Sequence, residues 1–167
     1  YRDFPNPFDD EGWALITKNF IEAARFARLA HFPCLALDAE YTAYQFDPGW
    51  KGYDLTQHSA KELGAKMQER WAKITSGIVE QYPTVDLLTL PEGSIHYGPL
   101  WSSMFAGMID GLIASKYDRG IHLFAESSYQ MRDPMAVSEF ALDVTETTAR
   151  KLPEPARKYW LSKCSVA

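Results

Sequence analysis

Two carboxylates end a short apolar run near the start of this 167-residue chain. The run reads P-C-L-A-L-D-A-E-Y from Pro33, and it stops at Asp38 and Glu40. Because the side chains of a strand alternate between its two faces, these acids point the same way as Cys34 and Ala36. Aromatic residues crowd the segment that follows. Two acids beside aromatic rings are typical of a site that binds and processes a substrate, although a solvated strand end is the alternative.

Two further apolar runs also lead to acids. The run 85–90 is followed by Glu92, and the run 121–125 is followed by Glu126. The same alternation places each acid on one face with earlier residues of its run: Leu88 and Leu90 before Glu92, and His122 and Phe124 before Glu126. Three predicted strands that lead to acids on the same face indicate that these carboxylates contribute to one site.

Segments with helical periodicity separate these runs. The apolar spacing and the end signals predict helices over 9–31, 59–82, 100–116, from 133 onward and over 156–163. Strands are predicted over 34–38, 85–90 and 121–125, with another beginning at 164. Strands that alternate with helices predict an α/β protein of parallel βα units with right-handed crossovers.

This order favours a partial (β/α)8 TIM-barrel-like architecture, with residues 1–167 as one barrel-type domain or a fragment of a larger barrel. A small doubly wound α/β domain is the alternative fold. The glycine-rich patterns G-x-G-x-x-G and G-x-x-x-x-G-K, which would favour that alternative, do not occur in the sequence.

The barrel prediction gives the acids a common location. Catalytic groups of barrel enzymes lie at the carboxyl ends of the strands, so we expect Asp38, Glu40, Glu92 and Glu126 at one rim. Clustered carboxylates can act as general acid and as base or nucleophile in glycoside hydrolysis. They can also hold a divalent metal, with help from His96 or His122.

Aromatic side chains near the same rim favour the first kind of chemistry. Flat apolar faces with polar edges suit sugar rings, whereas a metal-centred aldol or isomerase site needs fewer aromatic rings and more His or Lys. The alternative for each ring is that it packs one loop against another. The candidate substrate-binding residues are Tyr41, Tyr44, Trp50, Tyr53, His96, Tyr97, Trp101 and Tyr129.

The segment D-A-E-Y, residues 38–41, resembles the D-x-E-Y ending of the fourth strand in chitinase-like glycoside hydrolases. The resemblance implies that Glu40 is the general acid and that Asp38 orients the N-acetyl group of the substrate. The family pattern has a further Asp where this chain has Ala36, and it favours Trp where this chain has Ala39. The broader resemblance is to (β/α)-barrel glycoside hydrolases.

The sequence therefore predicts a glycoside hydrolase-like enzyme of carbohydrate metabolism, with Glu40 as acid and Glu126 or Glu92 as its partner. A divalent-metal barrel enzyme and a non-catalytic carbohydrate-binding or assembly module are the alternatives. The leading prediction includes no cofactor and no metal, and a carbohydrate is the expected substrate. There is no G-x-S-x-G motif, so a serine hydrolase is not expected.

The composition limits the classes of partner that we expect. The chain has 17 Lys and Arg against 22 Asp and Glu, so no basic surface for nucleic acid is expected. No apolar run approaches the roughly 20 residues that cross a bilayer, so no membrane partner is expected. Because a half-barrel exposes sheet edges, we expect the chain to need the remainder of a barrel or a partner chain. Cys34 and Cys164 are expected to be small buried thiols, which leaves the compartment undetermined.

Overall fold

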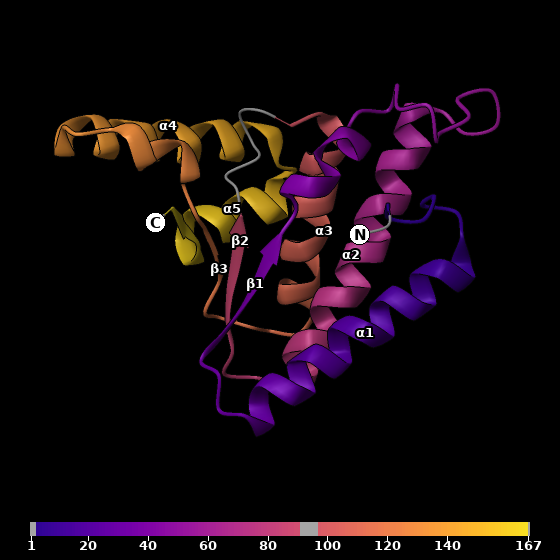
Figure 1. The fold of residues 1–167 in the computed structure, drawn as a ribbon, viewed down its shortest axis with the longest axis horizontal. Coiled ribbons are helices and arrows are strands. Elements are labelled where there is room, and N and C mark those ends of the chain that lie inside the picture. Colours follow the sequence, from indigo (N-terminus) through magenta and orange to yellow (C-terminus); the bar gives the residue numbers. More distant parts are fainter. Residues whose placement is uncertain (1–2, 91–96, 167) are drawn as a thin grey trace.

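The structure, a computed structural model, describes residues 3–90 and 97–166, without the side chains of Glu40 and Tyr41. Strands and helices alternate along this part of the chain, as the sequence predicts (Figure 1). The elements are α1 (Asp10–Leu29), β1 (Cys34–Asp38), the 3₁₀ helix η1 (Glu40–Phe46), α2 (Ala60–Gln81), β2 (Asp86–Leu90), α3 (Pro99–Ala114), β3 (Ile121–Leu123), the 3₁₀ helix η2 (Glu126–Gln130), α4 (Pro134–Lys151), α5 (Glu154–Lys163) and β4 (Ser165–Val166).

The strands form one parallel sheet in the order β1-β2-β3-β4. Ala36 pairs with Leu88, and Leu88 pairs with His122. These pairings confirm the predicted α/β class and the parallel βα units. Strand order follows chain order across the described sheet, without the reversal that marks the switch point of a doubly wound domain.

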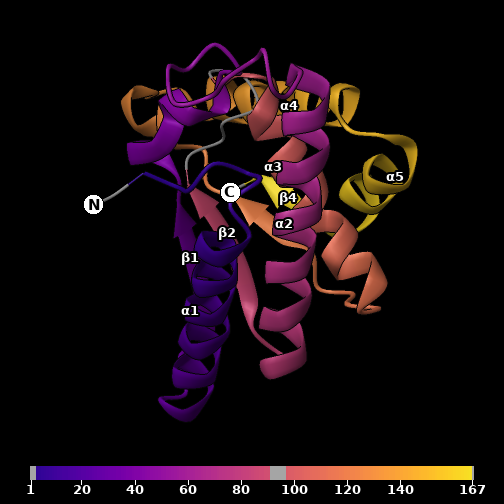
Figure 2. The same ribbon diagram turned by 90° about the vertical axis from the view of Figure 1, so that its right-hand side faces the viewer.

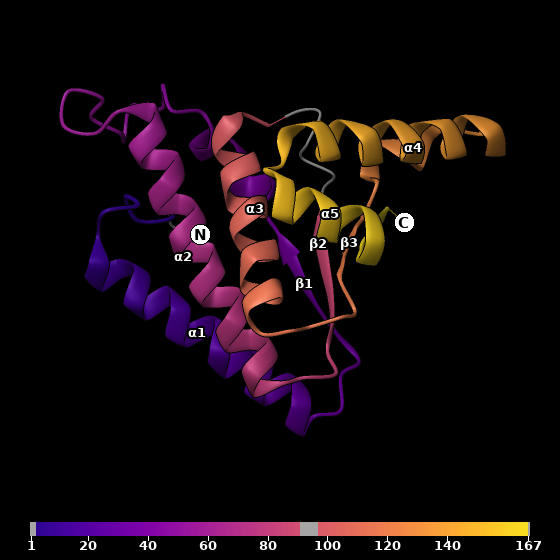
Figure 3. The ribbon, with the colours of Figure 1, turned by 180° about the vertical axis from the view of Figure 1, so that it is seen from behind.

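Helices α2, α3 and α5 lie on one side of the sheet (Figures 1 and 3). The strand side chains that face them are buried: Leu87, Thr89, Ile121 and Leu123. On the opposite side, called the open face below, Ala36 and Asp38 are exposed and Leu88 and His122 are half-buried. The open face is thus the face that carries Asp38, as strand alternation predicts.

Helix α3 is apolar on nearly every side because it lies between the sheet, α2 and α5. Two glycines allow its close approach to α2. A Cβ atom added at Gly107 would lie 2.2 Å from the Gln68 carbonyl oxygen, and one at Gly111 would lie 2.4 Å from the Ala72 carbonyl oxygen. A larger residue at either position would therefore push α3 away from α2.

Helix ends follow their local signals. Ser59 and Glu62 form a capping box at the start of α2, and the Asp133 carboxylate accepts a hydrogen bond from Met135 N at the start of α4. Helix α4 then crosses the carboxyl ends of the strands (Figure 2). Cys34 and Cys164 are half-buried free thiols. None of the described helices combines the length and the apolar character that a membrane span requires.

Candidate functional site

The pairing register relates the three strand ends that lead to the predicted glutamates. Ala36, Leu88 and His122 lie at one level of the sheet. Four residues further along the chain from each are Glu40, Glu92 and Glu126. Glu92 lies outside the described residues, as does the Glu40 side chain, so the register establishes only the strand ends that lead to them.

The backbone leaves the sheet in a similar way after β1 and after β3. Ala39 N donates to Leu90 O and Phe124 N donates to Thr89 O, each over 2.9 Å. The segments that follow β1 and β3 therefore both stay hydrogen-bonded to the end of β2 before they turn away. Ala125 (φ −84°, ψ 70°) then forms an inverse γ-turn closed by Glu126 N and Phe124 O at 3.0 Å. This turn ends β3 at Leu123, two residues earlier than predicted. In both places a buried alanine precedes the glutamate that opens a 3₁₀ helix.

The described carboxylates differ in their exposure. Asp38 is exposed at the end of β1, and Glu126 is half-buried at the start of η2. The Tyr129 hydroxyl donates a long hydrogen bond of 3.5 Å to Glu126 Oε1. Neither carboxylate is without a partner. Asp38 and Glu126 lie at the carboxyl ends of β1 and β3, where the sequence predicts them.

Two of the predicted substrate-binding rings are exposed at this end of the sheet. Tyr44, in η1, is 48% exposed, and Tyr129, in η2, is 68% exposed. The Tyr44 hydroxyl donates to Asp3 Oδ1, and the Tyr129 ring contacts Phe124 edge to face at 6.1 Å. About half or more of each side chain is therefore open to solvent.

The other described rings pack more closely. Tyr53 is buried, and its hydroxyl donates to Gln45 O over 2.9 Å. Burial raises the pKa of Tyr53 to about 12. Trp50 is half-buried between Tyr44 and Tyr53, with ring centroids 5.8 and 4.9 Å away. These contacts hold the segment after η1 together.

Trp101 and Tyr97 lie at the start of α3. Trp101 is buried and stacks on Phe105 at 5.0 Å. Tyr97 is half-buried and stacks on Phe46 at 5.7 Å. Because the side chains of Trp101 and Tyr53 are interior, they present no face to a ligand at the surface. The Tyr41 side chain and His96 lie outside the described residues.

The open face carries polar pairs that the sequence did not single out. His122 Nδ1 and Ser165 Oγ lie 2.7 Å apart, so the half-buried His122 side chain is hydrogen-bonded across β3 and β4. Arg119 donates to Asp86 Oδ1 from Nε over 2.9 Å and from Nη2 over 2.6 Å. Alternation from Leu88 predicts the face of Asp86, but only the sheet register shows which neighbours these side chains meet.

The described side chains include no group of three or more His, Cys, Asp or Glu placed to hold a metal ion. The described part of the candidate site therefore consists of Asp38 at the end of β1, Glu126 after β3, and the exposed rings of Tyr44 and Tyr129. Comparison of the chain with protein-family models, with curated proteins and with solved structures gives no match.

Proposed function

We propose that the chain is part of a (β/α)-barrel glycoside hydrolase-like enzyme that cleaves a glycosidic bond by carboxylate chemistry. The observation that carries the proposal is the register, which leads from one level of three adjacent parallel strands to Glu40, Glu92 and Glu126. Sequential strand order with helices on one side supports it, because a barrel repeats this arrangement until the sheet closes.

In this proposal Glu40 protonates the leaving-group oxygen, and Glu126 or Glu92 is its partner. The partner attacks the sugar if the two carboxyl groups lie about 5 Å apart, and activates a water if they lie about 6.5–9.5 Å apart. Asp38, exposed at the end of β1, holds the substrate. The exposed rings of Tyr44 and Tyr129 provide flat faces for sugar rings.

The proposal also assigns the open face to the interior of the barrel. In this chain Ala36 and Asp38 are exposed there, and β1 and β4 are the outer strands of the described sheet. Unpaired strand edges seek further strands. The remainder of a barrel, or a partner chain with parallel strands, would pair with these edges and cover the open face.

Glycan hydrolysis by the wild type and by three variants tests the proposal. Glu40→Gln, Glu126→Gln and Glu92→Gln each keep the size of the side chain and remove its acid function. Loss of a general acid or base costs about 10²–10⁴-fold in rate, so Glu40→Gln should lose at least about 10²-fold. Glu139→Gln, on an exposed part of α4, is the matched control and should keep full activity.

The same assay separates the alternatives. Full activity of Glu40→Gln would exclude the proposed acid. Activity that a chelator abolishes in the wild type would favour a divalent-metal enzyme. Glycan binding without turnover in the wild type would favour a carbohydrate-binding module.

A further inference from the structure

We propose that residues 3–8, called the N-terminal strap below, hold the β1–α2 loop (residues 39–59) in place, and that Gln45 is the residue through which they do so. Because this loop begins at the acid-bearing end of β1, Gln45 is a positioning residue for the candidate site. The consequence for catalysis rests on the proposed function, whereas the consequence for the loop does not.

Gln45 joins the loop to the strap through a buried side chain. It is 0% exposed, and its amide makes two hydrogen bonds to the backbone of one residue, Phe4. Phe4 N donates to Gln45 Oε1 over 2.8 Å, and Gln45 Nε2 donates to Phe4 O over 2.9 Å. Only a side chain with both a donor and an acceptor can satisfy these two backbone groups.

The strap is fixed to the helices on its other side. The Phe4 ring stacks on Trp13 of α1 at 5.9 Å and contacts Trp71 of α2 edge to face at 5.8 Å. Trp13 Nε1 donates to Asn6 O over 3.1 Å. The strap therefore rests on the buried contact between α1 and α2 and can serve as a rigid support.

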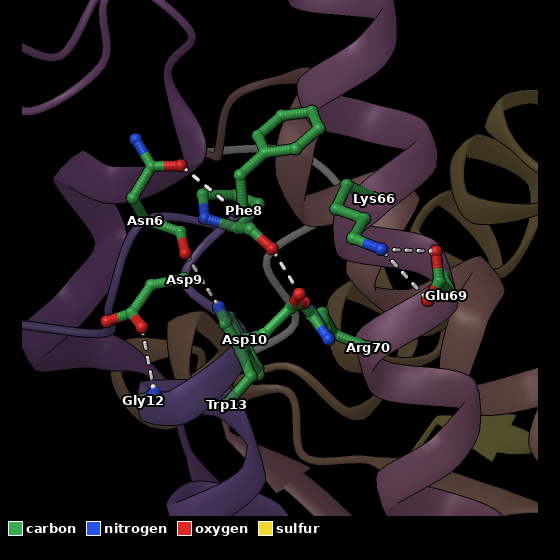
Figure 4. Close-up of polar contacts among 10 residues, drawn as sticks. Asn6, Phe8, Asp9, Asp10, Gly12, Trp13, Lys66, Glu69 and Arg70 are labelled. Carbon is green, nitrogen blue, oxygen red and sulfur yellow. Dashed lines mark hydrogen bonds and ion pairs between the residues drawn. The ribbon is translucent and has the colours of Figure 1, made fainter.

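Arg70 of α2 adds a polar anchor to the strap (Figure 4). Its Nε donates to Pro7 O over 3.0 Å, and its Nη2 donates to Asp10 Oδ1 at the start of α1. The guanidinium beside Asp10 lowers the pKa of that carboxyl. Arg70 is nearly buried, at 9% exposed, so its contacts order the chain between the strap and α1.

The strap contacts the loop at two further points. Near the start of the loop, Tyr44 donates its hydroxyl to Asp3. Near the end of the loop, the His58 ring stacks on Phe8 with centroids 3.6 Å apart and ring planes 9° from parallel. The contacts at residues 44, 45 and 58 thus hold the loop at both ends.

Local geometry connects Gln45 to the acid-bearing end of β1. Gln45 lies in η1, which begins at Glu40, so fewer than two turns of 3₁₀ helix separate them. The end of η1 is also held from the other side, because a Cβ atom added at Gly98 would lie 2.4 Å from the Phe46 carbonyl oxygen. A displacement of Gln45 would therefore move the backbone at Glu40 as well.

Gln45→Glu tests the role of the Gln45 amide, because the effect of the substitution should reverse when the new carboxyl is protonated. When ionised, the introduced carboxylate would accept from Phe4 N but could not donate to Phe4 O, and it would leave a charge buried. When protonated, the same carboxyl has a donor and an acceptor and would restore both bonds. Burial raises the pKa of a carboxyl, so protonation should be complete in mildly acidic solution.

Hydrogen exchange of the full chain, expressed as protection factors, provides the readout. We expect about tenfold or more loss of protection over 39–59 at pH 8, because a charged group that loses its partner costs at least about 1.4 kcal/mol. Protection should return toward the wild-type value at pH 5. Gln130→Glu, the same change at an exposed residue of η2, should leave the loop unchanged at both values.

Three results would overturn the proposal. Wild-type protection of residues 39–59 in Gln45→Glu at pH 8 would show that the Gln45 amide does not hold the loop. A loss of protection that persists at pH 5 would show that the effect is steric and does not come from the lost hydrogen bond. If Gln45→Glu unfolds the whole chain, Tyr44→Phe replaces it as the test. That variant removes only the contact with Asp3 and should lower protection of the loop alone. An unchanged loop in Tyr44→Phe would be the third contrary result.

An activity measurement extends the test to the candidate site. If the wild type hydrolyses a glycan, Gln45→Glu should lower kcat at pH 8 and recover at pH 5 relative to the wild type at each pH. If the wild type is inactive on every glycan, the proposed function fails while the exchange result still decides the strap. The two failures are therefore distinguishable.

Discussion

Gly107→Ala should separate the two helices that support the sheet. Gly107 lies in α3 where the helix meets α2, and the added Cβ atom would lie 2.2 Å from the Gln68 carbonyl oxygen and 2.8 Å from Gln68 Cα. Ordinary contacts of a Cβ atom begin at 3.4 Å. The helices must therefore separate by about 1.2 Å, the difference between 3.4 and 2.2 Å, because the obstructing atoms belong to the backbone and cannot rotate away.

Two opposing effects set the size of the change. Alanine in a helix interior is about 1 kcal/mol more favourable than glycine. Overpacking of a well-packed core costs about 1–3 kcal/mol, occasionally more, and here it disturbs the apolar layer between α2, α3 and the sheet. The clash is with backbone atoms at 2.2 Å, so the upper end of that cost, about 3 kcal/mol, applies. After the gain of about 1 kcal/mol from alanine, we expect a net loss of about 2 kcal/mol in the free energy of unfolding, or roughly 4–8 °C in Tm for a chain of this size.

Gly77→Ala is the matched control for this measurement. Gly77 lies in α2, and a Cβ atom there would meet only Cδ1 and Cγ1 of Ile21, at 2.6 and 2.7 Å. The Ile21 side chain can change rotamer, so Gly77→Ala should be neutral or slightly stabilising. Urea unfolding followed by circular dichroism compares the variants. A Gly107→Ala chain as stable as the Gly77→Ala chain would refute the close-approach argument.

Three further measurements test other buried groups. Thr75→Val should stabilise the chain by about 1 kcal/mol, because Thr75 Oγ1 is buried without a partner among the described residues. Thr75 lines a cavity of about 100 Å³, so a lower urea midpoint of the variant would instead indicate that the hydroxyl binds water there. The pKa of Tyr53 is about 12 in the folded chain and about 10 in the unfolded chain, so its contribution to stability is complete below pH 10 and is lost from pH 10 to 12. Between pH 9 and 11 the urea midpoint of Tyr53→Phe should therefore fall less than that of the wild type, and an equal fall would contradict this. Burial raises the pKa of Cys164 to about 12, so in a Cys34→Ser chain iodoacetamide should label Cys164 slowly at pH 8 until urea is added.

Local sequence signals predicted most elements of the fold. The Ser59–Glu62 capping box and the Asp133 cap mark the starts of α2 and α4 because their hydrogen bonds join residues two or three positions apart. The strand ends were predicted less well. The γ-turn at Ala125 ends β3 early, and no residue type at that point requires it.

The candidate site was predicted in part. Alternation along β1 predicted that Asp38 lies on one face with Ala36, and both side chains are exposed on the open face. The register aligns Ala36, Leu88 and His122, the residues four positions before the three glutamates. The burial of Tyr53 and Trp101 was not predicted, because an aromatic residue in a loop can face either the solvent or the core. Contacts from distant parts of the chain decide between these two locations.

The sequence by itself determined the order of the elements and the parity of the acids, because helix periodicity, strand alternation and capping depend on residues close together in the chain. Only the tertiary structure decided which sheet face lies open and which rings are buried. It also decided that Gln45 binds the backbone of Phe4, 41 residues earlier. These features arise from contacts between distant segments, and a contact of that kind leaves no periodic trace in the sequence.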